Sequence, residues 1–143
     1  MNEGETYYYG HHHIVISQPN DADEVVIVNF TGWAANKDQS CIVEVGEHPC
    51  ITKKSVVLYR AAQVLDPDAQ AAFVRASTKG ANVSQELLTR IQEGTQSDFI
   101  PQKCERIVAE SCRRKRATQR AAAVQNHPPP VAPAPQPPVT PDD

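Results

Sequence analysis

The feature that most constrains the fold is a change of hydrophobic period at Asp66. Before this residue, short β-branched and apolar runs alternate with clusters of turn-forming residues. After it, apolar residues recur at three- and four-residue steps. Short β-branched runs are typical of strands, whereas the longer period is typical of amphipathic helices. The sequence therefore predicts an α+β chain that is mainly β in its N-terminal half.

Five runs before Asp66 have the length and composition of strands. The second and third are joined by Gln-Pro-Asn-Asp-Ala-Asp, residues 18–23, which is a dense cluster of turn formers, so we expect a hairpin there. Short strands joined by brief turns predict a small barrel or a strongly bent sheet. The five runs are residues 6–10, 12–17, 24–31, 41–46 and 55–59.

About three helices are expected between residues 66 and 124. Asp66 can cap the first helix with Pro67 at its first position. Ser84 can cap the second helix, which Gly94 would end. The third helix would bury one face, because its apolar residues share a three- and four-residue spacing. These residues are Ile100, Cys104, Ile107, Val108 and Cys112.

The end of the chain has a composition that cannot form a core. Residues 127–143 hold eight of the twelve prolines and no aromatic residue. Such a segment buries too little apolar surface to offset the entropy lost on ordering. We therefore expect a β domain over 1–65, a helical extension packed on it over 66–124, and a disordered Pro-rich tail over 125–143.

Charge is distributed unevenly along the chain, whose net charge is −3. Residues 1–65 carry eight acidic and four basic residues, whereas residues 103–120 carry seven basic and two acidic ones. No apolar run reaches the roughly 18 residues that a membrane span needs, and the acidic N-terminus lacks the pattern of a signal peptide. We expect a cytoplasmic protein that does not bind membranes.

Three segments of the first half resemble motifs of the PemK/MazF-type plasmid-maintenance toxins. They are "HHHIVIS" at residues 11–17, "VVIVNFT" at residues 25–31, and "GEHPCITKKSVVLY" at residues 46–59. The resemblance covers residues 1–65. It implies a small SH3-like β-barrel, and an activity that many members share, the metal-independent cleavage of single-stranded RNA.

The resemblance also implies where the catalytic residues would lie. Members that cut RNA use an arginine in the first motif as an acid or as a cation for the transition state. This sequence has His11 there, or His12 if the register shifts by one, and Thr31 matches the family's threonine, which would orient the phosphate.

The residues themselves add a further candidate and an alternative. Histidine can transfer protons and stabilise phosphoryl charge near neutral pH, and His48 lies in a turn, where functional groups are common. Strand alternation places His11 and His13 on one face and His12 on the other. The candidate catalytic residues are thus His11, His12, Thr31 and His48. In the alternative interpretation, the triple histidine is a solvated strand start and His48 a plain turn residue.

Basic and aromatic residues are the candidates for RNA binding. Lysine and arginine pair with phosphates, and aromatic rings stack on bases. A solvated helix end near the C-terminal dipole would explain the basic run equally well, and core packing would explain some of the tyrosines. The candidates are Tyr8, Trp33, Lys53, Lys54, Arg113, Arg114, Lys115 and Arg116.

The expected partners follow from the resemblance: single-stranded RNA, a cognate antitoxin protein and a second copy of the chain. We expect no cofactor and no metal site, because Cys41 and Cys50 lack the Cys-x-x-Cys spacing of zinc ligands. The alternative function is a non-catalytic relative that binds protein or nucleic acid. Geometry should discriminate: Thr31, a histidine of the first motif and His48 along one open groove would favour an enzyme, whereas histidines on different faces would argue against one.

Overall fold

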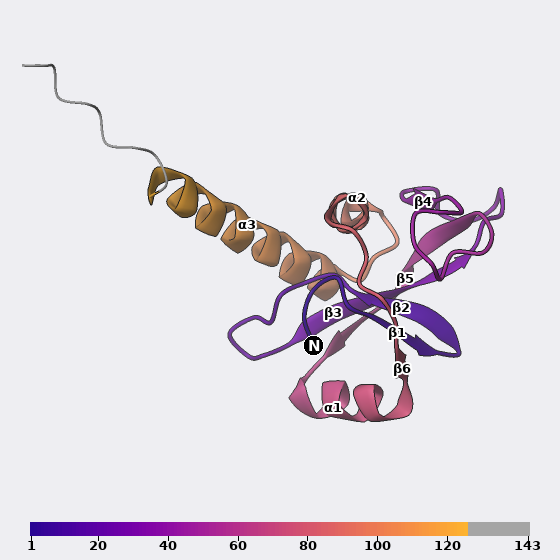
Figure 1. Ribbon diagram of the computed structural model, residues 1–143, viewed down its shortest axis with the longest axis horizontal. Helices are drawn as coiled ribbons and strands as arrows, with labels where there is room; N and C mark the ends of the chain where they lie inside the picture. Colours follow the sequence, from indigo (N-terminus) through magenta and orange to yellow (C-terminus); the bar gives the residue numbers. More distant parts are fainter. Residues whose placement is uncertain (126–143) are drawn as a thin grey trace, which may run out of the picture.

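The structure is a computed structural model that describes residues 1–125. Within them, six strands form one curled antiparallel sheet, a half-barrel in the order β4-β5-β3-β2-β1-β6, accompanied by three α-helices (Figure 1). The expected α+β class is therefore confirmed. The strands are β1 Thr6–Tyr9, β2 His11–Val15, β3 Val25–Gly32, β4 Ile42–Val43, β5 Ser55–Leu65 and β6 Thr78–Lys79. The helices are α1 Pro67–Ala76, α2 Gln85–Glu93 and α3 Gln102–Gln125, and a 3₁₀ turn, η1 Gly94–Gln96, follows α2.

The sheet is curled by an irregularity between its two longest strands. Ile27 of β3 pairs with Gln63 of β5, but Asn29 pairs with Leu58, so β5 carries extra residues at this point. Such insertions bend a strand and increase its twist. Strand β5 therefore continues through the bend to Leu65, beyond the expected run at 55–59. The expected hairpin between β2 and β3 is present.

Both faces of the sheet are covered, each by different helices. Ile14, Val28 and Tyr59 belong to the larger core, which α2 and α3 cover. Val15 and Ile27 belong to a smaller core with Phe73 of α1. Figure 1 shows α1 on one side of the sheet and the other two helices on the opposite side. Burial on both sides explains why the central strands are continuous runs of apolar residues. We refer to these sides as the α1 face and the α2/α3 face.

Helices α1 and α2 begin, and α2 ends, where their capping residues predict. The Asp66 carboxylate accepts a hydrogen bond from the Ala69 amide, and the Ser84 hydroxyl accepts one from the Leu87 amide. Gly94 is required at the end of α2 because a Cβ there would overlap the hydroxyl of Tyr59. That buried hydroxyl donates to the carbonyl of Ile91 at 2.6 Å, which seats α2 on the sheet.

Helix α3 packs with the face that its periodicity predicts. Cys104, Ile107 and Val108 are buried, together with Ile100 just before the helix, and Cys112 is half-buried. The buried Ser111 hydroxyl accepts a hydrogen bond from the Gln18 amide at 2.8 Å. From Arg116 to Gln125 every side chain is exposed, because the last turns of α3 extend past the sheet (Figure 1).

The sheet and the helices share one hydrophobic core across the expected boundary at residue 65. Strand β6, which the sequence did not predict, also returns the chain to the sheet by pairing with β1. The predicted disordered tail lies outside the described residues, apart from Gln125, which ends α3. In the described portion of the chain, no helix combines the length and apolarity needed to cross a membrane.

Candidate functional site

Strand register brings two of the three first-motif histidines, His11 and His13, onto the same face of the sheet as Thr31. His13 pairs directly with Asn29, and directly paired residues point to the same side. His11 is two residues from His13, and Thr31 is two residues from Asn29, so all four side chains project from the α1 face. Of the two alternatives for the family arginine position, His11 therefore lies on the face of Thr31, and His12 does not.

Lys37 contacts Thr31 and the residue after it at one end of this set of side chains. Lys37 Nζ donates to Thr31 Oγ1 at 3.0 Å and to the carbonyl of Gly32 at 2.7 Å. These two contacts fix an ammonium group beside a hydroxyl. The neighbouring carboxylate of Asp38 is bound instead by the hydroxyls of Ser40 and Ser97. An ammonium and a hydroxyl together offer donors to phosphate oxygens. We call His11, His13, Asn29, Thr31 and Lys37 the histidine–threonine face.

The two histidines of this face differ in environment. His11 is exposed, whereas His13 is half-buried, with its ring 5.1 Å from that of Phe73. The two imidazole rings lie edge to face at 6.5 Å. His13 Nε2 donates to the carbonyl of Tyr9 at 3.3 Å. Burial lowers the pKa of His13 below its usual value of 6.5, an effect that the Tyr9 carbonyl opposes and the neighbouring histidines reinforce. His13 is thus a neutral base near pH 7.

Three predicted RNA-binding residues lie at the same end of β3. The Trp33 amide donates to the carbonyl of Lys54 at 3.0 Å, and Lys54 Nζ lies 4.5 Å from the centre of the Trp33 ring. The side chain of Lys53 lies against Gly32, next to Thr31. Trp33 remains 42% exposed. An exposed indole with one ammonium group over its ring, and a second lysine against the adjacent Gly32, is suited to a base and its phosphate.

His12 and His48 lie on the opposite side of the sheet, where they line a pocket of about 300 Å³ with Tyr8. His48 is 5% exposed, and both of its ring nitrogens are occupied. Nε2 donates to the carbonyl of Ala81 at 2.7 Å, and Nδ1 accepts from the Cys50 amide at 3.1 Å. An imidazole bound at both nitrogens has no site left for proton transfer to a substrate. His48 instead ties its turn to the segment before α2.

His12 is half-buried beside His48, and burial, followed by the charge of His48, lowers its pKa from 6.5. Its ring lies 4.9 Å from that of Tyr8. The four candidate catalytic residues therefore do not line one groove. They divide into His11 and Thr31 on the α1 face, and His12 and His48 on the α2/α3 face. The expected single groove is therefore not formed, which argues against an enzyme that uses His48, and only His11 and Thr31 share a face as an active site would require.

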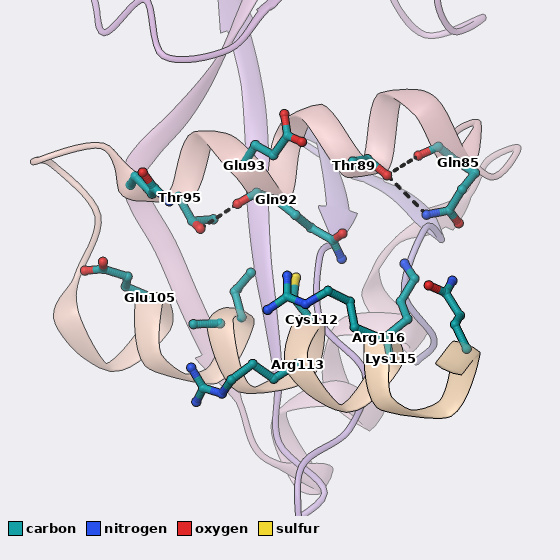
Figure 2. A pocket seen from close by; sticks show the side chains of 14 residues that line it. Gln85, Thr89, Gln92, Glu93, Thr95, Glu105, Cys112, Arg113, Lys115 and Arg116 are labelled. Carbon is teal, nitrogen blue, oxygen red and sulfur yellow. Dashed lines mark hydrogen bonds between the residues drawn. The ribbon is translucent and has the colours of Figure 1, made fainter. Parts of the chain in front are cut away.

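The four consecutive basic residues of α3 also lie in two different environments. Arg114 Nη2 donates to the carbonyl of Pro19 at 3.3 Å, and Lys115 Nζ pairs with Glu3 at 3.0 Å. These two residues are half-buried against the body of the protein. Arg113 and Arg116 are exposed and line a groove between α2 and α3 (Figure 2). The basic run therefore does not form one continuous phosphate track.

His13 and Lys37 of the histidine–threonine face were absent from the predicted set. His13 was predicted to share a face with His11, and only its pairing with Asn29 connects it to Thr31. Lys37 lies in a polar loop, and no local pattern indicates that it reaches Thr31. Among the residues that the structure describes, no three His, Cys, Asp or Glu side chains gather as metal ligands would.

Chemically, the histidine–threonine face combines a neutral imidazole, an exposed second imidazole and a fixed ammonium–hydroxyl pair. These groups can accept a proton, donate a proton and hold a phosphate, which is the set that metal-free phosphoryl transfer requires. No protein-family model matches this chain, and no curated protein matches it either.

Proposed function

We propose that the chain is a PemK/MazF-like protein whose half-barrel is of the SH3-like type, and that it cleaves single-stranded RNA without a metal ion. The observation that carries the proposal is that His11 and Thr31, which the motifs single out, project from one face of the sheet. Lys37, bound to Thr31 Oγ1, supplies a cation at this position.

In the proposed reaction, the RNA 2′-oxygen attacks the adjacent phosphorus and the 5′-oxygen leaves. The products are a 2′,3′-cyclic phosphate and a 5′-hydroxyl. His13 accepts the 2′-hydroxyl proton, since its lowered pKa keeps it neutral. His11 donates a proton to the leaving oxygen, while Thr31 and Lys37 bind the phosphate oxygens. The two histidines therefore transfer protons, and Thr31 and Lys37 stabilise the negative charge on the phosphate.

The neighbouring lysines and tryptophan would hold the nucleotides beside the scissile phosphate. Trp33 is partly exposed, with the Lys54 ammonium over its ring, and the Lys53 side chain lies against the preceding residue, Gly32. Stacking and ion pairing of this kind bind single strands with little sequence preference. Binding should therefore weaken as the salt concentration rises.

The test is cleavage of a mixed-sequence single-stranded RNA in EDTA by the wild type and by two matched variants. Thr31→Val removes the hydroxyl at nearly constant volume, and Thr31→Ser keeps it. We expect Thr31→Val to cleave about 100-fold more slowly, as when one donor to the transition state is lost. Thr31→Ser should stay within about 10-fold of the wild type. Equal rates for the Val and Ser variants would contradict the role of Thr31.

A second candidate function is RNA binding without cleavage. It is favoured by the openness of the surface around Trp33 and Lys54, which is suited to binding a strand and does not enclose it. A gel-shift measurement on the same RNA separates the two functions. Intact RNA that shifts with the wild type, and less with Lys54→Ala, would support the binding module. Intact RNA that does not shift would contradict both.

A further inference from the structure

A pocket of about 190 Å³ adjoins the histidine–threonine face at Lys37. Lys37, whose ammonium group binds Thr31, is one of its lining residues, and Leu58 and Arg60 of β5 are two others. Leu58 pairs directly with Asn29, so its side chain lies on the same side of the sheet as Thr31. A molecule that binds at Thr31 and Lys37 can therefore extend into this pocket.

Two loops that line the pocket are bound to each other. Asp38 belongs to the loop after β3, and Phe99 belongs to the segment between η1 and α3. Ser97 connects them, because its hydroxyl donates to the Asp38 carboxylate at 2.6 Å and accepts from the Phe99 amide at 3.2 Å. The carboxylate and the backbone of Phe99 are thus held together before any ligand binds.

The pocket offers an open aromatic ring and a free cation. Phe99 is 62% exposed, although phenylalanine is among the residue types most often buried. Arg60 is also exposed, and within residues 1–125 its guanidinium group takes part in no ion pair. Both side chains are therefore available to a ligand.

Asp38 adds an acceptor to this pair. Burial acts to raise the pKa of Asp38, but hydrogen bonds from Ser40 and Ser97 outweigh it and hold the value below the usual 3.8. The carboxylate is thus ionised near pH 7. An ionised carboxylate has about four lone-pair positions, so it can accept further hydrogen bonds beside those from the two serines.

An aromatic ring, a guanidinium group and a carboxylate together can recognise one particular base. Aromatic rings stack on any base. The guanidinium fork donates to two neighbouring acceptors, which on guanine are O6 and N7. A carboxylate accepts from two neighbouring donors, which on guanine are the N1 and N2 hydrogens. Adenine has an amino group in place of O6 and an acceptor at N1, so it would place a donor against Arg60 and an acceptor against Asp38.

We propose that this pocket binds a guanine base next to the phosphate held by Thr31 and Lys37, and that the protein therefore selects guanine-containing single-stranded RNA. Phe99 stacks on the base, Arg60 donates to O6 and N7, and Asp38 accepts from N1 and N2. The inference rests on the proposed function for the identity of the ligand. It adds a base preference that phosphate contacts do not supply, and Phe99 lies outside the region of family resemblance.

The test measures binding separately from cleavage. Two single-stranded RNAs of about ten nucleotides contain only uracil apart from one central guanine or one central adenine. Their 2′-hydroxyls are methylated, so that they cannot attack phosphorus. Fluorescence anisotropy with the full chain gives the two dissociation constants. We expect the guanine RNA to bind about 10-fold to about 100-fold more tightly, which is the discrimination that a well-placed bidentate pair supplies.

A variant and its matched control locate the preference. Arg60→Gln removes the guanidinium fork and should reduce the preference for guanine to within about threefold. Arg106→Gln makes the same change at an exposed position of α3 that does not line the pocket, and the preference should stay within about twofold of the wild type.

A change in the RNA makes the test independent of how any variant folds. Replacing guanine by 7-deazaguanine removes the N7 acceptor and should weaken binding to the wild type at least about 5-fold. The same replacement should make no further difference to Arg60→Gln, because the partner of N7 is already absent.

Equal affinity of the wild type for the guanine and adenine RNAs would overturn the proposal, as would a guanine preference that Arg60→Gln retains in full. A wild type that binds neither RNA would overturn it together with the proposed function. Cleavage of the same sequences with free 2′-hydroxyls separates the two claims. Cleavage without a guanine preference would support the proposed function and contradict the pocket. A guanine preference without cleavage would support the pocket and contradict the nuclease.

Discussion

The two faces of the sheet both carry histidines, but the histidines are bound differently. On the α2/α3 face, His48 is buried and hydrogen-bonded at both ring nitrogens. On the α1 face, His11 is exposed and shares its side of the sheet with Thr31 and Lys37. A histidine with both nitrogens occupied supports the fold, whereas an exposed one on the same face as a fixed cation is available for chemistry.

The comparison shows that residue type alone does not identify a site in this chain. His11, His12 and His13 are consecutive, yet alternation separates His12 from the other two. Changes on the closed α2/α3 face should therefore act on stability, and changes on the open histidine–threonine face should act on activity.

The largest effect is expected at Gly94, which seats α2 on the closed face. Gly94→Ala should lower the free energy of unfolding by about 3 kcal/mol, because the new Cβ overlaps the Tyr59 hydroxyl in a packed core. Urea unfolding measures the change. Gly10→Ala is the control, because a Cβ there meets open space and suffers only its positive φ of 70°, which costs about 1 kcal/mol. Equal losses at the two positions would show that the overlap at Gly94 is relieved.

The second prediction contrasts a histidine from each face. His48→Ala should lower the free energy of unfolding by about 2 kcal/mol, because it leaves the Ala81 carbonyl and the Cys50 amide without their partner. His11→Ala should change it by less than about 0.5 kcal/mol, because the His11 side chain is exposed. Thermal or urea unfolding of both variants checks the pair. Equal stability of the two variants would contradict a structural role for His48.

The smallest effect concerns pH and the half-buried histidines. His12 and His13 have pKa values below 6.5 because burial disfavours their charged forms. Their neutral state therefore stabilises the fold above the unfolded pKa of about 6.5, and this stability is lost as the pH falls through the lower folded values. Unfolding at about pH 7.5 and about pH 5.5 should show a decrease that His13→Gln reduces. A free energy of unfolding that rises as the pH falls toward about 5.5 would contradict the lowered pKa values of His12 and His13.

Carboxylates do not interfere in this window. Burial acts to raise the pKa of Glu5, but hydrogen bonds and the ion pair with Lys79 outweigh it and hold the value below the usual 4.5. Hydrogen bonds from Ser40 and Ser97 likewise outweigh burial at Asp38, whose pKa lies below its usual 3.8. Their contribution is fully present above those usual values and is lost only as the pH falls further. A decrease between about pH 7.5 and about pH 5.5 therefore reports on histidine.

Local signals in the sequence account for much of the fold. The caps at Asp66 and Ser84, the end of α2 at Gly94 and the buried stripe of α3 were all predicted, and the structure confirms them. These features depend on residues within a few positions of one another, so their physics is contained in a short window. The continuation of β5 to Leu65 depends on its pairing with β3, which a local window does not contain.

The site was less predictable, because it depends on which strands pair. The alternation of side chains along the strand separated His12 from His11. Only the pairing of His13 with Asn29 shows that His11 and His13 lie on the same face as Thr31. Lys37 reaches Thr31 from a loop with no periodic signal. The occupied nitrogens of His48 depend on Ala81, which is 33 residues away in the chain. Long-range contacts of this kind become visible only in the folded chain.

The most direct test of the central claim compares two adjacent histidines in one cleavage assay. His11→Ala and His12→Ala are made in the full chain and assayed on single-stranded RNA in EDTA beside the wild type. We expect His11→Ala to cleave at least about 100-fold more slowly, while His12→Ala stays within about threefold of the wild type. Loss of cleavage in His12→Ala with retention in His11→Ala would place the chemistry on the other face and contradict the account.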